Sequence, residues 1–282
     1  TGTAADPQFD PVPRDCQTTG CLPEHQMVGG NAWVPTLLQD PDWRLDAAED
    51  SPHLAITAHA ATTMLRRAAT LTATLTTSGT QNVAVVRVTN ETGHKLPTGY
   101  PEGRQMWLHL RAYDVAGNLV FESGRYDLDT QRLVRDPDVK VYEAKQGLTE
   151  NFADFLDKDP GATFHFILNN TIVKDNRIPP RGYDSEVWDE PGLRPVGATY
   201  ADGQHWDETV YELPNKATRV TAALYYQTAS REYVEFLKAN GGVDGEALYD
   251  LWARTPSPPV LIAGYPWYEV WMPIVTRTWS PR

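Results

Sequence analysis

Both cysteines of the chain lie in one short stretch, "CQTTGCLPEH", at residues 16–25. Covalent attachment of a c-type haem requires the pattern C-x-x-C-H, but four residues separate Cys16 from Cys21, and Leu22 occupies the place of the histidine. A structural zinc site needs about four ligands, and a redox dithiol normally reads C-x-x-C before a helix. We therefore expect a local disulfide, which adds about 2 kcal/mol of stability and indicates an oxidising compartment.

A second group of polar side chains could bind a metal ion. Asn170, Asp175 and Asn176 are close in sequence and carry the oxygen ligands that calcium prefers. Asn and Asp also favour turns, because their side chains bond to their own backbone. Both interpretations stay open at this stage, and the sequence predicts no firm metal site.

Enzyme signatures are absent from the sequence. It contains no G-x-S-x-G, no H-E-x-x-H, no phosphate-binding loop and no dinucleotide fingerprint. Paired carboxylates do occur, but they are too common in an acidic chain to indicate a glycosidase. We expect no catalytic residue and no enzymatic activity.

Charge and hydropathy restrict the partners. The 282 residues carry a formal net charge of −12, which argues against nucleic acid and anionic lipid and favours a basic protein partner. No apolar run approaches the roughly 20 residues needed to cross a bilayer. We expect protein partners and no transmembrane segment in this chain; an anchor, if the protein has one, is expected upstream of Thr1.

The elements that must position these residues follow from hydrophobic periodicity. Residues 1–50 are rich in Pro, Asp and Gly and predict an extended arm, and a helix is expected from Ser51 to Leu71. From Leu71 the period changes to two, and "LTATLTT" and "NVAVVRVTN" predict a β-hairpin. Further strands are expected at "MWLHLRAYD", "LVFESG", "KVYEA", "TFHFIL", "ETVYEL", "TRVTAALYYQT" and "WYEVWMPIVTRTW", with helices at "SREYVEFLKAN" and "DGEALYDLWAR".

This pattern predicts a mainly β protein. Short strands joined by long loops favour an antiparallel, Ig-like β-sandwich with several added helices. We expect residues 51–282 to form one such domain, ending in two helices and an aromatic segment, and residues 1–50 to form the arm with its local disulfide.

Residues 90–124, "NETGHKLPTGYPEGRQMWLHLRAYDVAGNLVFESG", resemble the core of the C-terminal β-domain of a group of multihaem c-type cytochromes. In that domain a TGHxxPTG loop joins two strands, and a G-x-x-x-x-ESG hairpin follows. The resemblance continues at residues 164–183 and 224–237, and "EHQMVGGNAWVPTLL" is similar to a segment that follows the last haem motif in such relatives. It covers most of residues 60–255.

The resemblance implies that "CQTTGCLPEH" is the remnant of a last haem site. The chain has no C-x-x-C-H, so we expect no haem and no other cofactor on it. His94 has three possible roles: an axial haem ligand in relatives, a contact to a partner's haem, or a hydrogen bonder that orders the loop. Glu102 and Arg104 are expected to hold the same loop by charge-assisted bonds.

Aromatic residues at both ends of the chain are candidates for an interface. Large apolar side chains are costly to leave in water, and interface anchors are enriched in Trp and Tyr. Packing on the chain's own sandwich is the alternative. The candidates are Trp33 and Trp43 in the arm and Trp267, Tyr268, Trp271 and Trp279 in the terminal segment.

These inferences predict a non-catalytic, haem-free scaffold or docking subunit of a membrane-associated electron-transfer complex, respiratory or photosynthetic. A periplasmic or extracellular location follows from the expected disulfide and the resemblance, and a c-type cytochrome is a candidate partner. Two alternatives remain: a β-sandwich module that binds carbohydrate or another surface ligand, and the C-terminal fragment of a longer multihaem cytochrome whose haems lie upstream of Thr1.

The cysteine assignment can be tested directly. We expect mass spectrometry of the non-reduced protein to show Cys16 and Cys21 linked to each other, because their spacing and the missing histidine both prevent haem attachment. A haem adduct on either cysteine, or two free thiols in protein that has not been reduced, contradicts the assignment.

Overall fold

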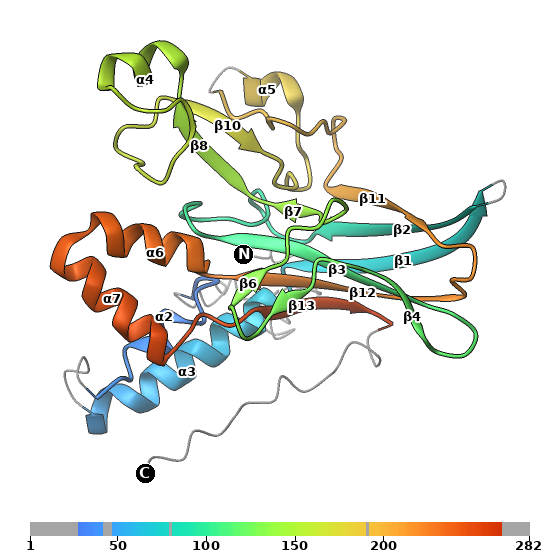
Figure 1. Ribbon diagram of the computed structural model, residues 1–282, viewed down its shortest axis with the longest axis horizontal. Helices are drawn as coiled ribbons and strands as arrows, with labels where there is room; N and C mark the ends of the chain where they lie inside the picture. The colour runs from blue at the N-terminus through green and yellow to red at the C-terminus, as the bar shows by residue number, and fades with distance from the viewer. Residues whose placement is uncertain (1–27, 42–46, 79–80, 190–191, 267–282) are drawn as a thin grey trace, which may run out of the picture.

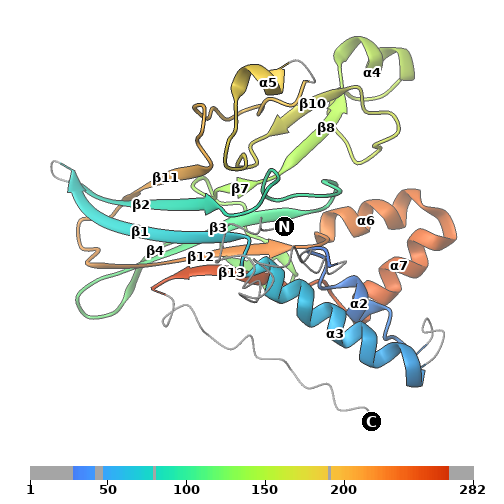
Figure 2. The same ribbon diagram turned by 180° about the vertical axis from the view of Figure 1, so that it is seen from behind.

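The computed structural model describes residues 28–41, 47–78, 81–189 and 192–266. Two antiparallel sheets are stacked at its centre, with a group of helices at one end and a smaller lobe on one side (Figures 1 and 2). The prediction of a mainly β, sandwich-like fold with added helices is confirmed.

The first sheet has the order β1-β2-β11 and contains the predicted hairpin. Leu71 and Ala73 alternate with threonines along its first strand and are buried, as expected for a sheet with one face on the core. The strands are β1 (Ala69–Ser78), β2 (Gln81–Asn90) and β11 (Trp206–Leu213).

The second sheet has the order β13-β12-β3-β4, and the short β7 also pairs with β3. Its central strand β3 is covered on both faces: Leu108 and Leu110 lie in the core between the sheets, and Trp107 packs in a separate cluster with Leu133 and Val141. The strands are β3 (Gln105–Tyr113), β4 (Leu119–Ser123), β7 (Val141–Tyr142), β12 (Arg219–Gln227) and β13 (Val260–Tyr265).

The main core is formed by side chains that face each other across the two sheets. Val86 and Val88 of β2, Leu108 and Leu110 of β3, and Leu224 of β12 have no exposed surface. Burial of each such side chain contributes about 1.5–3 kcal/mol. The core therefore fixes the position of β2 and β3, and with it both ends of the loop that joins them.

A small lobe is inserted between β7 and β11 (Figure 1). Its sheet has the order β10-β8-β9 and carries two short helices. A hairpin, β5 (Tyr126–Asp127) and β6 (Arg132–Leu133), lies elsewhere, between β4 and β7 in the chain. The lobe consists of β8 (Ala144–Leu148), α4 (Glu150–Leu156), β9 (Gly161–Ala162), β10 (Thr171–Asp175) and α5 (Ser185–Asp189).

One strand prediction in the lobe is wrong. "TFHFIL" at residues 163–168 forms turns, and the strand of this region is β10. The alternating phenylalanines are typical of a strand, but Phe164 packs edge-on against Tyr233 of α6 (Arg231–Asn240) and not on a sheet. Asn169 also donates a hydrogen bond back to the carbonyl of Thr163, which is typical of turns.

Four helices form the end of the molecule (Figure 1). The expected helix begins at Ala47 rather than Ser51 and contains Pro52. No helix in the described part of the chain is long and apolar enough to span a membrane. The four are α2 (Val34–Leu37), α3 (Ala47–Leu65), α6 (Arg231–Asn240) and α7 (Gly242–Arg254).

Candidate functional site

The loop that joins β2 to β3, residues 91–104, lies between α6 and the small lobe (Figure 2). It starts from Asn90, which is completely buried. The Asn90 Nδ2 lies 2.7 to 2.9 Å from the carbonyl oxygens of His94, Ile178 and Pro179. Its Oδ1 accepts hydrogen bonds from the backbone N–H and the hydroxyl of Thr92. One amide therefore holds the loop and the segment that follows β10.

A buried ion pair joins the same loop to the lobe. The Lys95 Nζ lies 2.6 Å from Asp175 Oδ2 at the end of β10 and also donates to the carbonyl of Leu193. Arg177 binds both oxygens of the same carboxylate, at 2.7 and 2.8 Å. Leu96 and Ile178 exchange two backbone hydrogen bonds beside this pair. Lys95 and Leu96, which we call the back of the loop, are thus held by an ion pair and by backbone hydrogen bonds.

The titration of the pair reflects its burial. Burial alone raises the pKa of Asp175, but Arg177 and Lys95 outweigh it and hold the pKa below the ordinary value of 3.8. Burial lowers the pKa of Lys95, and its hydrogen bond to Asp175 opposes that change. We take the pair as ionised at neutral pH, because Asp175 has two cationic partners at hydrogen-bond distance.

His94 contributes to this arrangement through its backbone. Its carbonyl accepts from Asn90, whereas the side chain is exposed, and no hydrogen bond involves the ring among the residues that the structure describes. Arg104 holds the loop as expected, since its Nη1 donates to the carbonyl of Thr98. Glu102 does not, because its buried Oε2 has no hydrogen-bond partner.

Aromatic rings from three segments meet in front of the loop. Tyr100 packs edge-on against Phe166 at 6.0 Å, and its hydroxyl lies 3.2 Å from that of Tyr233 on α6. Gly103 has a φ of +75°, and a Cβ there would lie 2.4 Å from the Tyr233 ring, so only glycine fits. These three segments are the ones that carry the sequence resemblance, and the fold brings them together.

Part of this aromatic group is exposed. The exposed fractions are 43% for Tyr100, 52% for Phe166 and 82% for Ile167. We call these three residues the exposed apolar surface. Tyr100 belongs to the anchored loop, whereas Phe166 and Ile167 belong to the turns between β9 and β10. Exposed large hydrophobic side chains that lie together are typical of a protein-binding site.

A cavity of about 300 Å³ adjoins Tyr233 and the loop. Its wall includes Glu102 and Arg104 of the loop, Arg135, Glu143 before β8, and Phe164. The wall therefore combines charged groups of both signs with one aromatic face, as small-ligand sites do.

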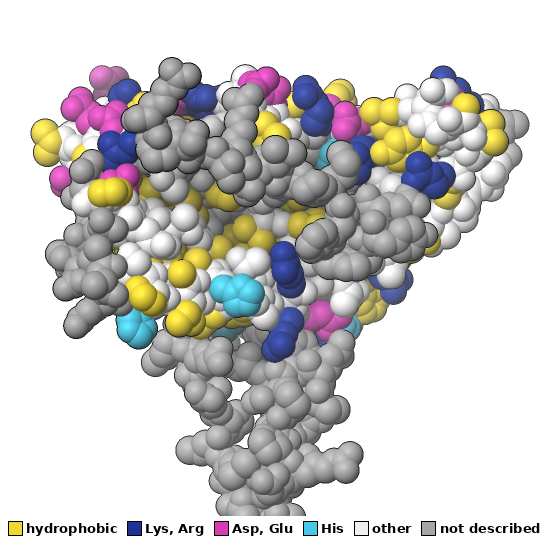
Figure 3. Space-filling model, turned by 90° about the horizontal axis from the view of Figure 1, so that it is seen from below, with side chains coloured by type: hydrophobic (Ala, Val, Ile, Leu, Met, Phe, Trp, Pro, Cys, Tyr) yellow, Lys and Arg dark blue, Asp and Glu magenta, His cyan; other side chains and the backbone are white. Residues whose placement is uncertain are grey.

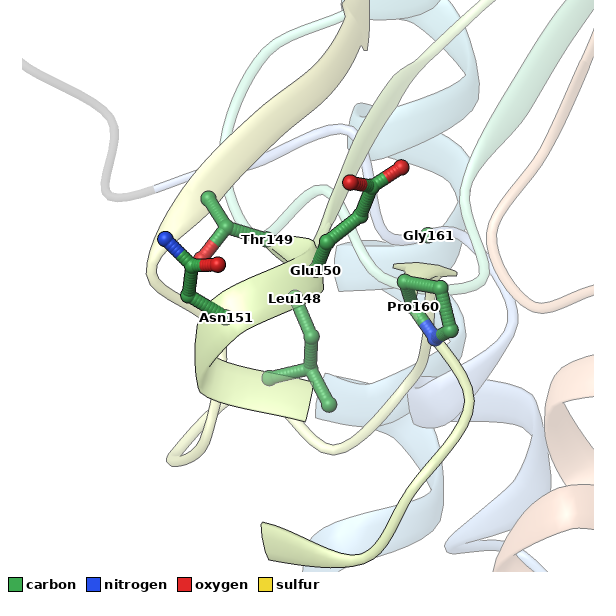
Figure 4. Close-up of a pocket in the computed structure, with 6 residues that line it drawn as sticks. All are labelled: Leu148, Thr149, Glu150, Asn151, Pro160 and Gly161. Carbon is green, nitrogen blue, oxygen red and sulfur yellow. The ribbon is translucent and has the colours of Figure 1, made fainter. Parts of the chain in front are cut away.

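Two other parts of the surface are weaker candidates for a binding site. A hollow of about 580 Å³ beside α4 is lined by six residues, among them Leu148 and Pro160, and the polar ends of Glu150 and Asn151 do not converge in it (Figure 4). Figure 3 shows scattered hydrophobic side chains on the lower face of the molecule. Neither place combines converging charged groups with an anchored backbone.

The three residues of the calcium hypothesis are separated by β10. Asn170 lies before the strand and bonds to Thr149, whereas Asp175 at its end binds Lys95 and Arg177. The Oδ1 of Asn176 accepts from the backbone N–H of Glu143. These contacts do not favour a cation, and the described residues contain no group of three His, Cys, Asp or Glu side chains that could hold one.

Among the predicted interface residues, only Trp33 can be placed. It is 6% exposed, packs with Leu251 and Trp252 of α7, and donates its indole N–H to the carbonyl of Thr255. Its buried face thus stabilises the chain's own helical end. Trp43, Trp267, Tyr268, Trp271 and Trp279 lie outside the described residues, as do Cys16 and Cys21.

Several residues of the site were not predicted from the sequence: Asn90, Lys95, Tyr100, Phe166 and Tyr233. Asn90 ends a strand immediately before Glu-Thr-Gly, and this position could have indicated an Asx turn. Phe166 gives no usable signal, because the alternating pattern of residues 163–168 predicts a strand and the segment forms turns.

The fold and the site define a β-sandwich domain that presents an anchored loop, an exposed apolar surface and an adjoining cavity. No protein-family model and no curated protein matches the chain. A solved structure that it resembles is a penta-haem cytochrome c552 from Thermochromatium tepidum, with 20% sequence identity and a TM-score of 0.43 over 72% of this chain. The chain spans 40% of the length of that cytochrome. A similarity this distant fixes neither a family nor a cofactor.

Asn90 and His94 should differ in their effect on stability. Asn90→Ala leaves the buried carbonyl of Pro179 without its donor and removes one of the two donors to the carbonyl of Ile178, so we expect the free energy of unfolding to fall by about 3 kcal/mol. His94→Ala removes an exposed ring and should change it by less than about 0.5 kcal/mol. Urea unfolding measures both. Equal losses would contradict this prediction, because the imidazole would then contribute as much to stability as Asn90.

Asp175 should make stability sensitive to acid. Its folded-state pKa is below the unfolded value of 3.8, so its contribution is present above that pH and is lost as the pH falls through the folded pKa. Asp175→Asn should lower stability at neutral pH by about 3 kcal/mol, because Lys95 stays buried without its closest counter-charge. The variant should also lose less stability than the unchanged protein as the pH falls below 3.8.

Urea unfolding at a series of pH values measures this effect, with Asp129→Asn as the control because Asp129 is exposed. The control should keep the acid dependence of the unchanged protein. An equally steep acid loss in Asp175→Asn would mean that other carboxylates determine it.

Proposed function

We propose that this chain is a non-catalytic docking or scaffold subunit that binds a protein partner within an electron-transfer assembly. The observation that carries the proposal is the loop at residues 91–104, whose back is fixed by Asn90 and Lys95 while its front presents Tyr100 to solvent beside Phe166. A surface that is rigid before binding loses little conformational entropy on association.

The composition of the exposed apolar surface favours binding of a protein. Aromatic residues are enriched at the centre of protein interfaces, where they supply most of the binding energy. The exposed ring of His94 belongs to the same loop, and an imidazole can contact a partner's haem or its propionates. The net charge of −12 favours a basic partner through long-range attraction.

The electron-transfer setting is supported by the sequence resemblance at residues 90–124, 164–183 and 224–237. These are the segments that supply Tyr100, Phe166 and Tyr233 to the aromatic group. A c-type cytochrome is accordingly the partner we propose, and an extracytoplasmic location is part of the same proposal. The sequence-based alternatives, a carbohydrate-binding module and a cytochrome fragment, have no comparable surface observation in their favour.

The proposal can be tested by purifying the tagged chain from its native host and recording the visible absorption of the material that accompanies it. We expect a c-type haem spectrum with the unchanged chain. The double variant Tyr100→Ser with Phe166→Ser should lose it, because the two rings carry the contact. His94→Ala should leave co-purification intact and alter the spectrum only if the imidazole reaches the haem.

The matched control replaces two exposed hydrophobic residues elsewhere, Val115→Ser and Val210→Ser, which are 91% and 61% exposed. This pair should assemble normally. Retention of the haem partner by the Tyr100 and Phe166 variant, with its fold intact, would remove the docking role from this surface.

A further inference from the structure

The cavity adjoining the exposed apolar surface is built from separate parts of the chain. It lies where the end of the β2–β3 loop, the start of β8, the segment after β9 and the first turn of α6 meet. Its volume of about 300 Å³ is at the lower end of the range for ligand sites, roughly 300–1,000 Å³. A ligand that fills it is therefore small.

Most charged groups of the wall are matched within the chain. Glu143 lies 3.0 Å from Lys174, 3.2 Å from Lys145 and 3.8 Å from Arg135. Glu232 is paired with Arg132 at 2.8 Å. These groups give the wall its polarity, and their charges already have partners.

Two groups of the wall are not matched. Glu102 is 8% exposed, and its Oε2 has no hydrogen-bond partner. Arg104 donates to a backbone carbonyl but forms no ion pair among the described residues. A buried carboxylate oxygen without a hydrogen-bond partner is unfavourable, and such atoms in folded proteins call for a ligand or an ion that completes them.

The two ends of the cavity favour ligand groups of opposite charge. Ser230, the N-cap of α6, is part of the wall, and the start of a helix favours a negative group. Arg104 has donors left for the same negative group. Glu102 requires the opposite, a cationic donor. Phe164 provides an aromatic face for an apolar portion.

We propose that this cavity binds a small zwitterion of the α-amino acid type, with its ammonium at Glu102, its carboxylate at Arg104 and the N-terminus of α6, and its side chain against Phe164. A simple cation or anion would satisfy only one of the two unmatched charges, and a neutral sugar would neutralise neither. The inference is independent of the docking proposal, because it concerns the cavity and not the exposed apolar surface.

The test uses the full chain and isothermal titration with each of the twenty L-amino acids. We expect at least one of them to bind at one site per chain. Its carboxamide, which lacks the negative charge, and its N-acetyl derivative, which lacks the positive charge, should each bind at least about tenfold more weakly, because each loses one charge-assisted contact. D-glucose should not bind.

Two variants assign the ends of the ligand. Glu102→Gln should weaken binding of the amino acid about tenfold and abolish its advantage over the N-acetyl derivative, whereas Arg104→Gln should abolish its advantage over the carboxamide. Glu102→Gln is nearly isosteric and removes an unpaired buried charge, so the free protein should be at least as stable as before. Glu212→Gln, an exposed change on β11, is the control and should bind normally.

Several results would overturn the proposal: no binding of any amino acid at millimolar concentration, equal binding of the singly charged derivatives, preference for D-glucose, or unchanged affinity in Glu102→Gln. The comparison of derivatives uses the unchanged protein and so decides the matter even if a variant fails to fold. Loss of partner binding with normal amino acid binding would affect only the docking proposal.

Discussion

The buried amide of Asn90 holds together the parts of the molecule that matter for binding. It sits at the end of β2, where the core between the two sheets fixes the backbone, and from there it bonds to the loop and to the segment after β10. Nearly all of the hydrogen-bonding capacity of one side chain is used in this way. The buried side chain of Asn90 therefore holds the loop in place while the ring of Tyr100 on that loop stays exposed.

The ion pair of Lys95 and Asp175 also connects the loop to the lobe, but through electrostatic attraction. A buried pair gains little net stability, because desolvation offsets the attraction, but its geometry is demanding and fixes the register between loop and lobe. The two backbone hydrogen bonds between Leu96 and Ile178 fix the same register. The lobe is thus attached to the sandwich by these polar contacts and by the side chain of Ile178, which is completely buried in the apolar core of the sandwich.

Much of the fold could be predicted from sequence. The alternation of Leu71 and Ala73 with threonines identified the first hairpin, and the helix predicted at "SREYVEFLKAN" is α6. The lobe could not be predicted, because its strands are short and the apolar residues of its turns pack on α6 instead of forming a sheet face. The unmatched charge of Glu102 is a property of the assembled fold, and sequence alone had predicted the opposite for it.

The contact between Gly103 and α6 has a mechanical consequence. The carbonyl of Gly103 accepts from the backbone N–H of Ser230 at 2.8 Å, and the ring of Tyr233 covers the glycine. A displacement of the loop at Gly103 would therefore require a matching displacement of α6, which packs against α7. The loop is thus attached at Gly103 to the helical end of the molecule and at Asn90 to the sandwich.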